Sequence, residues 1–190
     1  MFNKDFVFKN YFLKAKKTSK NLKKTNNFFK LLKTDIKNFK IPLLQSFEND
    51  FEMDFSADTV KKFSGCQNIV VIGMGGSILG TKAIYSFLKS RIKKKLFFFD
   101  NLDSCLHYNF KKLINYKNTC FLAVSKSGDT LETITNLNLI ASKISLKNKL
   151  IIISEIKNSS LMNIANKFNA EVIEHKDFIG GRYSVMSEAG

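Results

Sequence analysis

Apolar positions follow two different spacings along the chain. In residues 14–40 they recur at helical intervals, for example at Leu22, Leu32 and Ile36, which predicts one or two surface helices. From residue 68 onward, short β-branched or aromatic runs alternate with segments of helical spacing. The runs predict strands at Asn68–Gly73, Leu96–Asp100, Thr119–Ser125, Lys149–Ser154 and Ala170–Ile173. The segments between them predict helices at Ser77–Ser90, Ser104–Tyr116, Thr130–Ser145 and Ser159–Phe168.

This alternation indicates the fold class. Strands that are apolar on both faces and separated by helices of 10–15 residues are typical of a parallel sheet with right-handed crossovers. We therefore expect an α/β fold with a parallel sheet of about five strands flanked by helices, preceded by an N-terminal helical segment. Pro42 predicts a break after that segment, and a short helix is expected at Ala57–Phe63.

Charge divides the chain into zones. Residues 1–40 hold 12 lysines, whereas residues 41–60 hold five acidic residues and no basic one. The 190 residues suit one domain plus an appendage, since domains commonly contain about 100–200 residues. We predict that residues 1–60 form a helical N-terminal segment with an acidic linker, and that residues 61–190 form the domain.

The net charge of +15 suggests a nucleic-acid partner, but the composition offers a simpler explanation. Lysine, asparagine, isoleucine and phenylalanine, all encoded by AT-rich codons, make up 85 of the 190 residues. Only Arg91 and Arg182 are arginine, the residue best suited to forked contacts with phosphate and guanine. We expect no specific nucleic-acid partner. A basic nucleic-acid or acidic-membrane binder acting through residues 1–40 stays an alternative.

The sequence also bears on compartment. No apolar run approaches the roughly 20 residues of a membrane-spanning helix, and the lysine-rich start does not resemble a secretory signal. The three cysteines, Cys66, Cys105 and Cys120, are odd in number and irregularly spaced. We therefore expect core packing for the cysteines, no membrane partner and a cytoplasmic location.

The loop after the first predicted strand, Gly73–Ser77, is rich in glycine. It lacks the third glycine of a dinucleotide fingerprint, and Thr81-Lys82 inverts the order that a Walker A loop requires. Backbone N–H groups, the Ser77 hydroxyl and a helix dipole at this turn would suit one phosphate or several sugar hydroxyls. The alternative is a tight turn with a serine cap.

The loop after the third predicted strand, Ser125–Thr130, offers three hydroxyls and one ammonium at a predicted helix start. Clustered hydroxyls, backbone amides and a helix N-terminus suit a phosphate monoester. A capping box with Asp129 as N-cap and Glu132 as its partner needs no ligand and is the competing interpretation. We favour phosphate, and the missing nucleotide fingerprint favours a small phosphorylated metabolite.

Three segments resemble the N-terminal signatures of the phosphoglucose isomerase family, in that family's order: Val70–Gly80, Ser125–Thr133 and Gly180–Gly190. The resemblance covers about residues 68–190 and implies a sugar isomerase (SIS) domain. It implies an enzyme that interconverts glucose 6-phosphate and fructose 6-phosphate through an enediolate, in glycolysis and gluconeogenesis.

The resemblance also implies roles for individual residues. Arg182 matches the arginine that stabilises the enediolate, and would be catalytic. The matches to substrate-binding positions are Gly76, Ser77, Ser125, Lys126, Ser127, Thr130 and Glu132. The competing interpretation of Arg182 is an exposed salt-bridge partner. No metal or other cofactor is expected, since His107, His175 and the cysteines have no metal-ligand spacing.

One departure from the family is serious. The family's general base, ring-opening histidine and late lysine lie in its second half, and neither His107 nor His175 matches that histidine. We therefore interpret the chain as an N-terminal fragment, truncated at its C-terminus, that binds phosphate weakly and does not catalyse the isomerisation. The resemblance implies a homodimer at full length. The alternative function is a non-catalytic sugar-phosphate-binding SIS regulatory protein.

Overall fold

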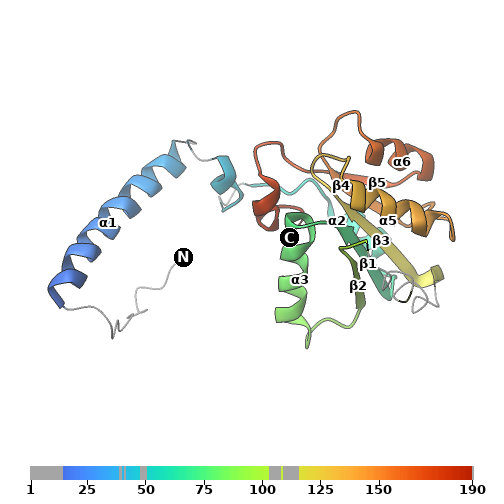
Figure 1. The fold of residues 1–190 in the computed structure, drawn as a ribbon, viewed down its shortest axis with the longest axis horizontal. Coiled ribbons are helices and arrows are strands. Elements are labelled where there is room, and N and C mark those ends of the chain that lie inside the picture. Colours follow the sequence, from blue (N-terminus) through green and yellow to red (C-terminus); the bar gives the residue numbers. More distant parts are fainter. Residues whose placement is uncertain are drawn as a thin grey trace. The chain divides into compact units, whose positions relative to one another are not determined.

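The structure is a computed structural model that describes residues 15–38, 40, 42–47, 51–102, 108 and 116–189. It divides into two compact units, residues 1–45 and 46–190, and each is described by itself (Figure 1). The first unit contains helix α1 (Ala15–Lys37), and the 3-10 helix η1 (Pro42–Phe47) begins at the proline that predicted a break. These units are defined by compactness alone, so the assignment of residues 61–190 to a functional domain stays a prediction.

Five parallel strands form the sheet of the second unit. They are β1 (Asn68–Gly73), β2 (Lys95–Phe99), β3 (Thr119–Val124), β4 (Leu150–Ser154) and β5 (Glu171–Glu174). Their order is β2-β1-β3-β4-β5, and Ile69 of β1 lies beside Leu96 of β2 and Cys120 of β3. The predicted α/β fold with a parallel five-stranded sheet is confirmed, because each strand is found within one or two residues of its predicted bounds.

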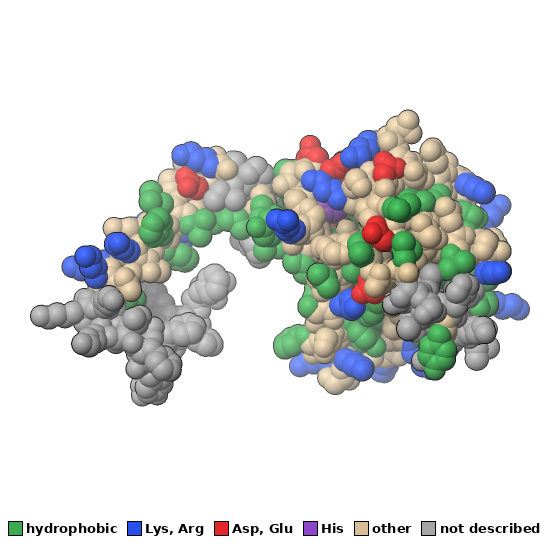
Figure 2. All heavy atoms as spheres, in the orientation of Figure 1, with side chains coloured by type: hydrophobic (Ala, Val, Ile, Leu, Met, Phe, Trp, Pro, Cys, Tyr) green, Lys and Arg blue, Asp and Glu red, His purple; other side chains and the backbone are tan. Residues whose placement is uncertain are grey.

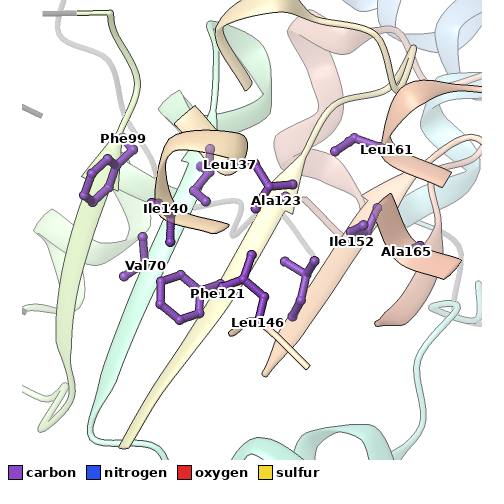
Figure 3. Close-up of a cluster of buried hydrophobic side chains, with 12 residues drawn as sticks. Val70, Phe99, Phe121, Ala123, Leu137, Ile140, Leu146, Ile152, Leu161 and Ala165 are labelled. Atoms are coloured by element: carbon purple, nitrogen blue, oxygen red, sulfur yellow. The ribbon is translucent and has the colours of Figure 1, made fainter. Parts of the chain in front are cut away.

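Helices cover the two faces of this sheet. Helices α5 (Leu131–Ala141) and α6 (Ser160–Phe168) cover one face, where a buried cluster joins them to β1, β3 and β4. Figure 3 shows Leu137 and Ile140 of α5 above Val70 and Phe121, with Leu161 of α6 nearer Ile152. Helix α3 (Gly76–Leu88) follows β1, and the chain then moves along the sheet in the opposite direction. Right-handed crossovers therefore place α3 on the other face (Figure 1).

That second face also receives helix α2 (Ala57–Phe63) and the C-terminal 3-10 helix η3 (Gly181–Met186). Its buried cluster joins Val124, Ile153 and Ile173 to Ala189. Asp54 ties this region together, because its N–H donates to Glu188 Oε1 at 3.3 Å and its carboxylate accepts from the Glu174 N–H at 2.5 Å. These contacts hold Glu188 and Ala189 beside the sheet.

Two of the predicted helices are not found as predicted: one ends early, and the other cannot be compared with the structure. The predicted helix Thr130–Ser145 ends at Ala141, since the Ser142 hydroxyl bonds the Leu139 carbonyl at 2.8 Å and the chain then turns. The predicted helix Ser104–Tyr116 lies almost entirely outside the described residues. No helix in the described parts of the chain is long and apolar enough to cross a membrane. Figure 2 shows basic side chains scattered over the visible face of the second unit, between acidic ones.

Candidate functional site

A cleft of about 530 Å³ opens at the carboxyl ends of the strands. Its walls come from the loops after β1, β3 and β4 and from η3, as expected for an open parallel sheet. The lining residues are Met74, Gly76, Ser77, Lys126, Ser127, Thr130, Glu155, Lys157, Gly181 and Arg182. Six of the eight residues predicted from the sequence are among them, brought together from three distant segments.

The loop after β1 is pressed against η3. A Cβ atom on Gly76 would overlap the Gly181 carbonyl, so only glycine allows this approach. The Ser184 hydroxyl bonds the Gly76 carbonyl at 2.8 Å and holds the two segments in contact. Gly75, not Ser77, is the N-cap of α3, and no side chain caps the helix. Ser77 is therefore not a serine cap, and its hydroxyl has no protein partner within the described structure.

The loop after β3 is ordered by its own hydroxyls. The Ser125 hydroxyl lies 2.8 Å from Thr130 Oγ1 and accepts from the Gly128 N–H at 3.2 Å. Gly128 has φ +75°, and a Cβ there would overlap the Ser159 side chain. These contacts place Ser127 and Thr130 at the N-terminus of α5, where helix N–H groups favour an anion.

The competing interpretation of this loop, a capping box at Asp129 and Glu132, is wrong. Thr130 is the N-cap of α5, and its side chain makes no capping bond. Asp129 turns instead to α6, where its carboxylate accepts from the Ser160 N–H at 2.8 Å. That bond holds the pKa of the Asp129 carboxyl below its ordinary value. The hydroxyls and N–H groups at the start of α5 are thus not used up by a cap.

Charged side chains sit along one wall of the cleft. Glu155 carries the single carboxylate among the described lining residues, and it pairs with Lys157 Nζ at 2.5 Å and Lys126 Nζ at 3.4 Å. The hydrogen bond from Lys157, followed by the interaction with Lys126, holds the pKa of the Glu155 carboxyl below its ordinary value. Sequence reasoning missed Glu155 and Lys157 because the loop after β4 carries no recognisable motif.

Arg182 lies on η3 and is exposed along the cleft. Its guanidinium forms no ion pair with any described residue, so the interpretation as a salt-bridge partner has no support in this part of the chain. The planar fork is therefore available to a ligand's oxygen atoms.

Two predicted site residues do not line the cleft. Ser125 is 1% exposed and lies beneath it, where its hydroxyl holds the loop. Glu132 is half-buried in the first turn of α5 and is not among the lining residues. Both residues belong to the same loop and helix start as the lining residues. The sequence alone therefore could not distinguish residues that support the loop from residues that face the cleft.

The described residues considered for other chemistry, His175, Cys66 and Cys120, do not line the cleft. His175 is buried, and its Nδ1 lies 3.0 Å from the Lys176 carbonyl oxygen. Burial, with a further contribution from nearby Cys66, raises the pKa of the Cys120 thiol to about 12, in keeping with core packing. Cys105 and His107 lie outside the described residues. No cluster with the makeup of a metal site occurs among the described residues.

Known proteins resemble this chain over most of its length. The family model of phosphoglucose isomerase matches residues 36–190. The glucose-6-phosphate isomerase of Methanocaldococcus jannaschii is 34% identical over 168 residues, which cover 83% of this chain and 41% of that protein. The enzyme of the same name from Borreliella burgdorferi strain ZS7 is 38% identical over 141 residues, covering 68% of this chain and 26% of that protein.

Solved structures resemble the fold as well. A glucose-6-phosphate isomerase from Chlamydia trachomatis superposes with a TM-score of 0.61 at 24% identity, over 78% of this chain and 32% of that one. A hypothetical protein from Thermus thermophilus superposes with a TM-score of 0.63 at 21% identity, over 82% of this chain and 36% of that one. The chain thus spans well under half the length of these curated relatives and structures. On the extent of the family match, the chain belongs to the phosphoglucose isomerase family.

Proposed function

We propose that this chain supplies the phosphate-binding part of an aldose–ketose isomerase that interconverts glucose 6-phosphate and fructose 6-phosphate, a step of glycolysis and gluconeogenesis. One observation carries the proposal. The cleft joins Gly76 and Ser77, the Lys126–Thr130 loop and Arg182, which come from three segments separated by about 50 residues each. These are the segments that resemble the family's signatures.

The phosphate group would bind at the start of α5. The Ser127 and Thr130 hydroxyls can donate hydrogen bonds to phosphate oxygens, and the helix dipole favours the negative charge. Lys126 adds an ammonium at the same wall. Ser125 supports this group from below through its bond to Thr130, so we assign it to shaping the loop.

The sugar would extend towards Gly76, Ser77 and Arg182, which line the same cleft. Gly76 and Ser77 present an uncapped helix start and a hydroxyl, both suited to sugar oxygens. Proton transfer between C1 and C2 passes through an enediolate, whose negative charge the Arg182 guanidinium would stabilise. The guanidinium stays protonated throughout, so it stabilises the charge as it forms and takes no proton.

Two ligands test the proposal on the chain itself. Inorganic phosphate tests binding at the Ser125–Thr130 loop alone, whereas 6-phosphogluconate adds a carboxylate at the position of the sugar's C1. Ser127→Ala should weaken the binding of both ligands by roughly 2- to 10-fold, the effect of one lost hydrogen bond. Arg182→Lys should weaken 6-phosphogluconate and leave inorganic phosphate unchanged. If Arg182→Lys weakens both equally, Arg182 binds the phosphate and its catalytic role is wrong.

Hydrogen exchange gives an independent readout. Saturating 6-phosphogluconate should slow amide exchange in Ser125–Thr130, because a ligand that binds only the ordered loop stabilises it. Exchange in α2, which takes no part in the cleft, serves as the internal control. Equal exchange in Ser125–Thr130 with and without ligand would remove the phosphate assignment.

Further parts of the proposal rest on the family resemblance and the sequence. We place residues 61–190 in the sugar isomerase domain and expect the longer protein to act as a cytoplasmic homodimer without a specific nucleic-acid partner. The non-catalytic regulatory alternative is less well supported, because the matching family model and the relatives reported above are isomerases.

A further inference from the structure

The wall of the cleft formed by the loop after β4 carries two charged residues, Glu155 and Lys157, that the proposed function does not use. Glu155 lies between two lysines that face the same cleft, with its side chain only 18% exposed. The Glu155 N–H donates to the Lys126 carbonyl at 3.1 Å, so the loop after β4 is fixed to the phosphate loop. A carboxylate is therefore held beside the site at which the proposed function places a phosphate dianion.

The two lysines are held differently. Lys126 Nζ also donates to the Asp177 carbonyl at 2.7 Å, so its position does not depend on Glu155 alone. Lys157 is 47% exposed, and Glu155 is the partner of its ammonium within the described structure. Lys157 is thus free to leave Glu155 for another anion, whereas Lys126 stays at the wall.

We propose that Glu155 competes with the ligand's phosphate for Lys126 and Lys157, and that Lys157 is an additional phosphate-directed cation released when phosphate enters. This inference rests on the proposed function. Without a ligand, the carboxylate neutralises the lysines and repels anions from the cleft. A bare phosphate ion gains little by displacing it, whereas a sugar phosphate also gains contacts at Ser77 and Arg182. Glu155 therefore weakens the binding of inorganic phosphate more than that of a sugar phosphate.

Removing the charge of Glu155 and removing the charge of Lys157 should have opposite effects on phosphate affinity. Glu155→Gln keeps the side chain's shape and removes the competing charge, so the chain should bind inorganic phosphate about 3- to 10-fold more tightly. Lys157→Gln removes the additional cation and leaves Glu155 less neutralised, so binding should weaken by a similar factor of about 3 to 10. The double variant should bind phosphate with an affinity between those of the unmodified chain and Glu155→Gln, because residues in contact do not act additively and Lys157→Gln can no longer leave Glu155 less neutralised.

Titration calorimetry of the 190-residue chain with inorganic phosphate measures these affinities, and circular dichroism checks that each variant is folded. Glu171→Gln is the matched control, because Glu171 pairs with Lys62 at 2.7 Å and does not line the cleft. It removes one negative charge elsewhere and should change affinity by less than about twofold. Raising NaCl to about 1 M should shrink the effects of Glu155→Gln and Lys157→Gln, because salt screens interactions between exposed charges.

The outcomes separate this inference from the proposed function. If the unmodified chain binds neither inorganic phosphate nor 6-phosphogluconate, both are wrong. If it binds phosphate and Ser127→Ala weakens binding, but Glu155→Gln leaves binding unchanged, the competition is wrong and the phosphate site stands. If Glu155→Gln weakens binding, Glu155 positions the lysines for the ligand, and the competition is again wrong.

Discussion

Gly76 shows how a single missing side chain shapes the cleft. A Cβ at this position would overlap the Gly181 carbonyl and lie 3.0 Å from the Arg182 Cα. These are backbone atoms, which cannot move aside as a flexible side chain does. Two walls of the cleft therefore meet at a contact that only glycine permits, and the glycine signature has a steric cause independent of any ligand.

Gly76→Ala should accordingly destabilise the chain by about 1–3 kcal/mol, because α3 and η3 must separate. Chemical denaturation followed by circular dichroism measures this loss. Gly65→Ala is the control, since a Cβ on Gly65 meets no atom within 4 Å, and it should change stability by less than about 0.5 kcal/mol. Equal stability of the two variants would mean that the contact between α3 and η3 is looser than the structure has it.

Asp129 makes stability depend on pH. Its carboxylate accepts from the Ser160 N–H at the start of α6, and its pKa lies below the ordinary value of 3.8. A depressed pKa contributes stability at pH values above the ordinary pKa, and this contribution is lost as the pH falls through the lower one. Asp129→Asn keeps the hydrogen-bond acceptor and removes the charge.

We expect Asp129→Asn to lower the melting temperature at pH 7, with a difference that shrinks as the pH falls below 3.8. Thermal melts between about pH 2 and pH 7 would measure it, at about 0.1 M salt throughout. A difference that is the same at every pH would show that the change acts through packing and not through the carboxylate charge.

Helix α5 connects the core to the cleft. Its N-terminus follows the Ser125–Thr130 loop, and Leu137 and Ile140 are fully buried against the sheet (Figure 3). The packing of this helix therefore fixes where its first N–H groups point. We therefore expect substitutions in the core of α5 to lower the free energy of unfolding more than they change ligand affinity.

Leu137→Ala should cost about 2–5 kcal/mol in unfolding free energy, the usual range for emptying a buried leucine site. Leu131 lies on the same helix but is 69% exposed, so Leu131→Ala should cost less than about 0.5 kcal/mol. Urea titrations of both variants provide the comparison. A loss below about 1 kcal/mol for Leu137→Ala would contradict the close packing of this core.

The elements also show what the sequence can and cannot predict. The strands are recognisable because they are buried runs bounded by glycine or polar residues, and Asn68–Gly73 is found with its predicted ends. The partner of Asp129 was not predictable, because local spacing favoured Glu132 whereas the fold brings the α6 start beside the loop. Glu155 and Lys157 were missed because their loop carries no recognisable motif, and only the pairing of β4 with β3 brings that loop to the cleft.

At the scale of the whole molecule, the described lining of the cleft offers hydroxyls and cations suited to an anion, but no group suited to proton transfer. An aldose–ketose isomerisation needs a positioned base, and such groups contribute about 10²- to 10⁴-fold to rates. Glu155 is the one carboxylate among the described lining residues, and no described histidine lines the cleft. The lysines beside Glu155 lower its pKa, which makes it a weak base.

We therefore expect the 190-residue chain to show no turnover of fructose 6-phosphate above background in an assay coupled to glucose-6-phosphate dehydrogenase. The same preparation should bind 6-phosphogluconate, so that the lack of turnover is not a lack of folding. An active isomerase added to the assay controls for the coupling enzyme. Turnover that disappears in Glu155→Gln would identify Glu155 as a working base despite its lowered pKa, and would overturn the division between binding and chemistry.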